Sequence, residues 1–261
     1  MHKLRLFPAL VLAALFALPI APAQALNNRS WVASNGSGTA CTRSAPCADF
    51  NTAISATNAG GEINCVDQGD FGSFIPITNA ITIDCEAVQG RVGGATTSGF
   101  FAAVVVQAAE TDVVVLRGLD IEGNGVGRAG VAFTSGRALH IEKCLIRNFI
   151  FTTAGWGILA IPVSNTSELF VSDTVLENNG TSSSGGGILV APVIVNGVTR
   201  VTLSRIEARN NFFGIKADGT AASGGVINMT VRDSLAAGNG SNGIVATGTA
   251  SGPAIIMMVE R

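Results

Sequence analysis

The chain has 261 residues, of which 47% are hydrophobic and only 13% are charged. Intrinsic disorder is excluded, because it requires low hydrophobicity and high net charge. Without residues 1–25, which contain Lys3 and Arg5, the chain holds 14 Lys and Arg against 18 Asp and Glu, a net charge of −4. This weak acidity argues against a nucleic-acid partner, which usually binds a basic patch.

Residues 1–25 are predicted to form a secretory signal peptide. Lys3 and Arg5 precede an apolar run from Leu6 to Ile20, and Ala23-Gln24-Ala25 offers small residues for cleavage. The alternative is an uncleaved membrane anchor, which is disfavoured because prolines interrupt a stretch already short for a bilayer. We therefore expect a secreted protein, extracellular, periplasmic or on the cell surface, with no transmembrane span after cleavage.

Residues 26–61 are predicted to form an entry strand, Ser30-Trp31-Val32, and a capping segment. Between Pro46 and Ala59 the apolar residues recur at a helical period, and Gly60-Gly61 predicts the end of that helix. A short amphipathic helix here would cover the open end of a solenoid, where apolar side chains and strand edges are otherwise exposed.

The five cysteines favour an oxidising compartment. Cys41 and Cys47 close a short loop, whereas Cys65 and Cys85 lie in similar strand-like segments, so we expect the pairs 41–47 and 65–85. Four cysteines still allow three connectivities, and free buried thiols are the alternative. Cys144 is left over and is predicted to be a small buried residue.

From residue 62 onward the chain becomes repetitive, which predicts an all-β parallel β-helix over residues 62–261. Each coil is expected to hold three short strands. The first strand is marked by Leu116, Ile141, Val171, Leu203 and Val231. The second is marked by Ile121, Ile146, Leu176, Ala208 and Ala236. The third follows a glycine and is marked by Val131, Ile158, Ile188, Ile215 and Ile244.

A line of charges alternates in sign when these repeats are stacked. Each member stands two residues after a first-strand residue, at a spacing of 30, 32, 28 and 28 residues: Lys143, Asp173, Arg205, Asp233 and Arg261. Neighbouring coils of a β-helix lie about 4.8 Å apart, so opposite charges would meet along one column. Asn124, Asn179, Asn211 and Asn239, with Asn148 one place early, predict a second ladder at another turn.

The last coil is predicted to be incomplete. Residues 254–261 repeat the pattern of a first strand, and no second or third strand follows in the sequence. An uncapped end would be an aggregation hazard, so either a partner covers this edge or the chain is a fragment, which we favour.

The passages Cys41-Thr-Arg-Ser-Ala-Pro-Cys47, Gly60-Gly-Glu-Ile-Asn-Cys-Val-Asp67 and Ile81-Thr-Ile-Asp-Cys85 resemble the entry segment of secreted right-handed β-helix repeat proteins. The run Leu139-His-Ile-Glu-Lys-Cys-Leu-Ile-Arg-Asn148 and the later Asn-Gly coils carry the same resemblance, which covers nearly the whole mature chain. These proteins share the pectin-lyase-like fold, and many have no established activity. The resemblance implies a right-handed β-helix and export rather than a particular reaction.

An enzyme of this fold is the alternative to a non-catalytic scaffold. A polysaccharide lyase could use Lys143 as base with Asp173 and Asp233 holding Ca²⁺, but Arg205 between the two aspartates opposes a divalent cation. A glycoside hydrolase needs converging carboxylates, and the acids here are spread out beside cations. With His140 the only histidine after residue 25 and no CxxC, we expect no metal site and no cofactor.

The leading hypothesis is a secreted, non-catalytic β-helix whose ladder of charges contacts polysaccharide or a cell surface. The candidate ligand-binding residues are Lys143, Asp173, Arg205, Asp233 and Trp156. Trp156 precedes a glycine at an expected turn and could stack on a sugar, although half-buried packing is the simpler alternative. A fragment of a longer adhesin is the third hypothesis. The sequence does not indicate the ligand or the oligomeric state.

Overall fold

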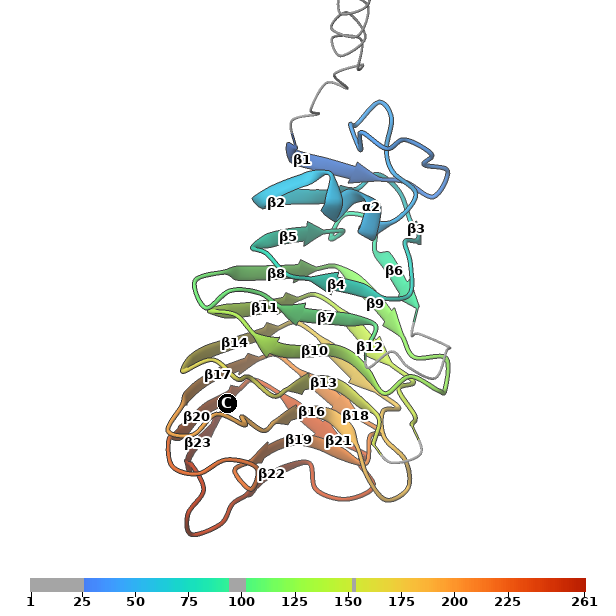
Figure 1. The fold of residues 1–261 in the computed structure, drawn as a ribbon. Helices are drawn as coiled ribbons and strands as arrows, with labels where there is room; N and C mark the ends of the chain where they lie inside the picture. Colours follow the sequence, from blue (N-terminus) through green and yellow to red (C-terminus); the bar gives the residue numbers. More distant parts are fainter. Residues whose placement is uncertain (1–25, 94–101, 152–153) are drawn as a thin grey trace, which may run out of the picture.

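The computed structural model describes residues 26–93, 102–151 and 154–261. Successive strands wind into a stack in which each coil adds one strand to each of three parallel sheets (Figure 1). The described chain is therefore an all-β parallel β-helix, as predicted, with one short helix near its N-terminal end. The right-handed sense remains a prediction.

Sheet 1 has nine strands and includes the first strand of every coil. In spatial order its strands are β1 (Asn27–Val32), β2 (Thr57–Cys65), β5 (Ile81–Asp84), β8 (Val113–Arg117), β11 (Ala138–Glu142), β14 (Thr166–Ser172), β17 (Val198–Ser204), β20 (Val226–Arg232) and β23 (Ala254–Glu260). The first coil thus begins at Thr57, before the expected residue 62, and β1 pairs with β2 ahead of it.

Sheets 2 and 3 have seven strands each. Sheet 2 contains β3 (Gly69–Asp70), β6 (Gly90–Gly93), β9 (Leu119–Glu122), β12 (Leu145–Arg147), β15 (Val175–Glu177), β18 (Glu207–Arg209) and β21 (Leu235–Ala237). Sheet 3 contains β4 (Ile75–Ile77), β7 (Val104–Gln107), β10 (Ala129–Ser135), β13 (Trp156–Ala160), β16 (Gly186–Val190), β19 (Phe213–Asp218) and β22 (Ile244–Thr247).

The three predicted sets of apolar residues each occupy one register column. In sheet 1, Ile141 pairs with Leu116 on one side and Val171 on the other, and the column continues to Val259. The columns through Ile146 and Ile158 are equally regular in sheets 2 and 3. A slip of one residue would turn every side chain to the opposite face, so the apolar pattern determines the register.

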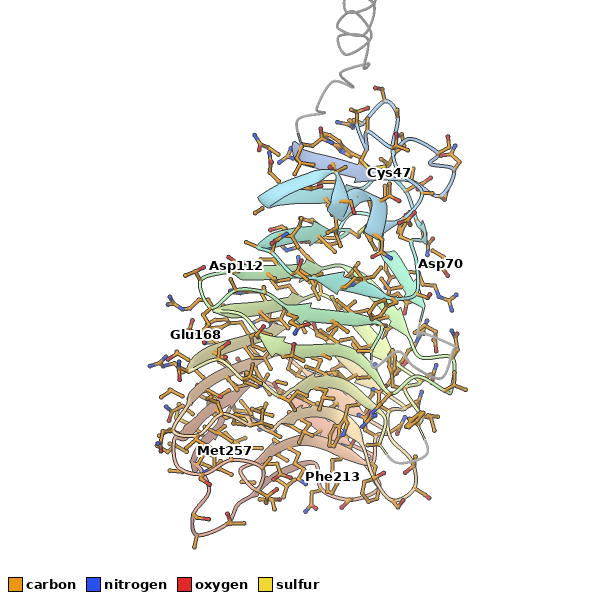
Figure 2. All side chains as sticks on the ribbon, in the orientation of Figure 1. Cys47, Asp70, Asp112, Glu168, Phe213 and Met257 are labelled. Carbon is orange, nitrogen blue, oxygen red and sulfur yellow. A yellow bond between two sulfur atoms is a disulfide. The ribbon has the colours of Figure 1, made fainter. Side chains whose placement is uncertain are left out.

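The main core runs between the three sheets along the stack (Figure 2). The strand residues that point inward are almost wholly buried, such as Leu116, Ile146 and Ile158. Removing one such side chain from water contributes about 1.5–3 kcal/mol. Each coil adds a few of these side chains to the same core, so stability accumulates coil by coil.

The predicted helix exists but is shorter than expected. Helix α2 (Phe50–Ser55) begins after Asp49, whose carboxylate accepts a hydrogen bond of 2.8 Å from the Thr52 N–H. It ends before Thr57, the first residue of β2. The expected end at Gly60-Gly61 is wrong, because pairing with β1 and β5 takes those residues into β2. Phe50 packs on Phe71, and the capping role of the helix remains a prediction.

Both predicted disulfides are present. Cys41 is joined to Cys47, and Cys65 at the end of β2 is joined to Cys85, just after β5 in the next coil. The second bridge therefore connects neighbouring coils. Gly90 leaves the space for it, because a Cβ there would lie 2.8 Å from Cys85 Sγ. No helix in the described ranges is long and apolar enough to cross a membrane.

Candidate binding surface

The predicted charges lie at the corner where sheet 1 turns into sheet 2. Lys143, Asp173, Arg205 and Asp233 follow β11, β14, β17 and β20, and all four have φ between 50° and 53°. Lysine and arginine rarely adopt that left-handed conformation, whereas aspartate adopts it more often. Each of the four backbone N–H groups donates to a carbonyl of the next coil, as Asp173 does to Ser204 over 3.1 Å. These residues form one column, which we call the charge ladder.

Two ion pairs organise the charge ladder. Arg205 donates from Nε and Nη2 to both carboxylate oxygens of Asp173, over 2.6 and 2.7 Å. This bidentate contact lowers the pKa of Asp173 and raises that of Arg205. Lys143 pairs with Glu86, two coils away, because Gly118 fills the intervening place without a side chain. That hydrogen bond raises the pKa of Lys143. Glu86 was not among the predicted residues.

A second group of charges lies beside the charge ladder on sheet 1. Arg117 donates to Glu142 and to Asp84, each over 2.9 Å, and so joins three adjacent coils. These bonds raise the pKa of Arg117. On sheet 2, Arg147 reaches Asp120 over 2.9 Å. Most charges near this corner therefore hold neighbouring coils together.

A hollow of about 270 Å³ lies on the outer face of sheet 1, next to the charge ladder. Arg205 Nη1 donates to Ser204 Oγ over 3.0 Å, and Arg232 Nε donates to the same oxygen over 3.3 Å. Arg232 is exposed and makes no ion pair within the described residues. The lining of the hollow combines one aromatic ring, one aliphatic side chain, hydroxyls, one carboxylate and two guanidinium groups: Phe170, Val171, Ser172, Thr202, Ser204, Glu142, Arg205 and Arg232. We call this the sheet 1 hollow. The Glu142 carboxylate is bonded to Arg117.

The aromatic side of this hollow is rigid. Phe170 stacks on His140 of the preceding coil, with ring centroids 4.6 Å apart and an interplanar angle of 15°. Burial lowers the pKa of His140, which keeps the imidazole neutral at pH 7. A neutral imidazole adds no charge beside the Phe170 ring, so the charges of the hollow are those of Glu142, Arg205 and Arg232.

Asp233 lines a neighbouring hollow of about 380 Å³ together with Arg205 and Arg261. The structure therefore brings Asp173 and Arg205 into direct contact and places Asp233 one coil further along the charge ladder. Lys143 lies at the other end of the column, bonded to Glu86. Of the predicted residues, Arg205 is the one that lines both hollows. Arg232 was not predicted, because it pairs with Ser204 in sheet 1 rather than with a residue of the ladder.

Trp156 is separate from this surface. It is the first residue of β13 in sheet 3, not part of an exposed turn, and only 7% of it is exposed. It belongs to a second hydrophobic cluster with Ala129, Ala132 and Leu159, and its ring lies parallel to that of Phe213. Little of the indole face is left for a sugar.

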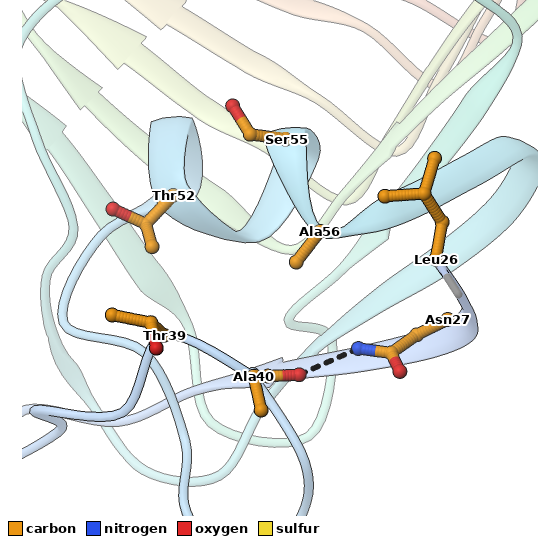
Figure 3. Close-up of a pocket in the computed structure, with 7 residues that line it drawn as sticks. All are labelled: Leu26, Asn27, Thr39, Ala40, Thr52, Ser55 and Ala56. Carbon is orange, nitrogen blue, oxygen red and sulfur yellow. Dashed lines mark hydrogen bonds between the residues drawn. The ribbon is translucent and has the colours of Figure 1, made fainter. Parts of the chain in front are cut away.

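Another hollow, of about 410 Å³, lies at the N-terminal end of the stack (Figure 3). Leu26, Asn27 and Ala40 line it on one side, and residues of α2 line it on the other. The Asn27 amide donates to the Ala40 carbonyl over 2.6 Å.

Cys144 is buried, as predicted, and forms no disulfide. Burial raises the pKa of its thiol to about 12, and its Sγ lies 3.2 Å from the Glu142 carbonyl. A thiol with this pKa is almost wholly protonated at neutral pH and is a poor nucleophile. In the described part of the chain, no three His, Cys, Asp or Glu side chains gather in a way that could hold a metal ion.

The chain matches no family model, no curated protein and no solved structure.

Proposed function

We propose that this protein is an exported, non-catalytic, right-handed β-helix that binds acidic polysaccharide on its sheet 1 face, in the extracellular space or on a cell surface. The observation that carries the proposal is the sheet 1 hollow. It joins an aromatic ring, a row of hydroxyls and an arginine, Arg232, without an acidic partner among the described residues. Glu142 also lines the hollow, and Arg117 balances its charge over 2.9 Å.

The chemistry of the sheet 1 hollow suits a uronate-containing chain. Guanidinium groups bind carboxylates through charge-assisted hydrogen bonds, and Arg232 has donors not used by Ser204. Ser172 and Thr202 offer hydroxyls that both donate and accept, and the Phe170 ring offers an apolar face for sugar C–H groups. Because the lining residues come from four successive coils of sheet 1, a polymer that runs along the stack can contact all of these coils.

The charge ladder supports a binding role rather than catalysis. A hydrolase needs one carboxylate free to act as base and another kept protonated. The Asp173 carboxylate is occupied on both oxygens by Arg205, which lowers its pKa and disfavours protonation. The contact also puts a cation where the lyase alternative requires a divalent ion.

Binding of the mature chain to immobilised polygalacturonate and hyaluronate tests the proposal. Arg232→Gln should weaken binding about tenfold, since it removes one charge-assisted contact. Arg200→Gln is the matched control, because Arg200 is also exposed on sheet 1 but is paired with Glu168. Product masses from the same samples, with and without Ca²⁺, should show no new oligosaccharides. New products, or equal binding by both variants, would overturn the proposal.

A further inference from the structure

A second row of left-handed residues lies at the corner between sheets 2 and 3. Asn148, Asn178, Asn210 and Gly238 follow β12, β15, β18 and β21, with φ of 59°, 55°, 54° and 65°. The Asn148 amide is bonded to the Glu122 carboxylate over 3.0 and 3.1 Å. The amides of Asn178 and Asn210 are exposed, and neither has a hydrogen-bond partner within the described residues.

The backbone holds these two amides in place. The Asn178 N–H donates to the Arg209 carbonyl over 3.3 Å, and the Asn210 N–H donates to the Ala237 carbonyl over 3.1 Å. The two residues therefore stand one coil apart, at a spacing of about 4.8 Å. A Cβ on Gly238 would lie 2.6 Å from Asn210 Oδ1, so this glycine leaves the space that the Asn210 amide occupies.

Both amides line a hollow of about 510 Å³, the corner hollow. Its apolar side consists of Phe212 and Ile150, and Ile150 is 42% exposed. The Phe212 ring is held edge-to-face against Phe213, with centroids 4.7 Å apart. The turn residues Thr181 and Ser182 add hydroxyls. None of the described residues that line this hollow carries a charge, in contrast to the sheet 1 hollow.

We propose that the corner hollow binds an uncharged sugar ring of a polysaccharide. A primary amide offers a donor and an acceptor together, which matches a pair of adjacent sugar hydroxyls, and two amides one coil apart present this pattern twice. Phe212 and Ile150 cover the C–H face of the ring. The uncharged lining favours a neutral sugar over a uronate, so this site has a different ligand from the sheet 1 hollow.

Titration of the mature chain with cellohexaose, mannohexaose and maltohexaose by calorimetry tests the proposal. The double substitution Asn178→Gly and Asn210→Gly removes both amides, and glycine suits this backbone because Gly238 adopts it in the same column. Asn196→Gly is the matched control: Asn196 is exposed with φ of 58°, but it precedes β17 at another corner.

At least one hexasaccharide should bind the wild type and the Asn196 variant alike, and the double variant at least tenfold more weakly. Phe212→Ala should weaken the same ligand. No binding of any of the three probes, or equal binding by the double variant, would overturn the proposal. Arg232→Gln should leave neutral binding unchanged while it weakens binding of acidic polymers, so failure of this site and failure of the sheet 1 proposal are distinguishable.

Discussion

Charged residues occupy a backbone conformation that usually favours glycine or asparagine. Lys143, Asp173 and Arg205 all turn the chain from sheet 1 into sheet 2 with positive φ. At this corner a side chain points away from the stack, where it can meet the residue one coil above or below. Gly118 occupies the corresponding corner of the coil between Glu86 and Lys143. Because it has no side chain, Lys143 can reach Glu86 across that coil. The alternation of sign offsets part of the conformational cost.

The substitution Asp173→Lys tests whether the alternation of charges along the ladder stabilises the fold. The substitution places three cations in consecutive coils and breaks the bidentate contact with Arg205, so the melting temperature should fall by a few degrees. Backbone strain is not the cause, because Lys143 adopts the same φ in the same column. An unchanged or higher melting temperature would show that the charges do not interact.

The substitution Asp173→Asn removes the negative charge of the side chain but keeps nearly the same shape. The pKa of Asp173 is lowered by Arg205, so its carboxylate stabilises the fold above the ordinary pKa of an aspartate, and that contribution is lost as the pH falls through the lowered value. The Asn variant should be less stable than the wild type at pH 7, and the difference should vanish in acid. A difference that stays constant with pH would contradict this assignment.

Among the secondary-structure elements, the turn between sheets 2 and 3 carries two asparagine columns rather than the one predicted. Asn178 and Asn210 adopt the left-handed turn. The adjacent Asn179, Asn211 and Asn239 make the amide ladder, in which each Oδ1 accepts from a backbone N–H of the preceding coil. Asn179 and Asn211 are buried, so the ladder satisfies polar groups inside the stack that water does not reach.

Asn211→Ala should lower the free energy of unfolding by about 3 kcal/mol, because it leaves the Asn179 N–H and the Leu176 carbonyl without these partners in a buried site. Asn239→Ala is the control. It removes the same two kinds of bond, to the Asn211 N–H and the Ala208 carbonyl, at a half-buried position where water can replace them. Urea denaturation should give a clearly smaller loss for Asn239→Ala, and equal losses would refute the burial argument.

For the molecule as a whole, the Cys65–Cys85 bridge ties the first two coils together. Replacing both cysteines by alanine should cost about 3 kcal/mol, since the bond closes a loop of 20 residues, whereas the loop of 6 between Cys41 and Cys47 is worth about 2 kcal/mol. Denaturation of the two double variants gives the comparison. Peptide mapping of the non-reduced protein should recover 65–85, and a 41–65 link would contradict the coil assignment.

Much of this architecture could be read from the residues. The apolar columns through Ile141, Ile146 and Ile158 and both disulfides are confirmed by the register and the bonds. The predicted end of α2 at Gly60-Gly61 is wrong, because these two glycines belong to β2, which pairs with β5. The glycine after Trp156 predicts a turn, but both residues belong to strand β13 of sheet 3.

The sequence by itself determined the period, the register and the sign of each charge in the charge ladder, because these depend on spacing along one strand and on which face each residue occupies. Only the tertiary structure decided which charges are already paired and where surface hollows remain. Those outcomes depend on side chains from several coils whose loops differ in length, such as Glu86 with Lys143, or Asn178 and Asn210 with Phe212. Contacts of that kind form across the stack, and no local pattern in the chain encodes them.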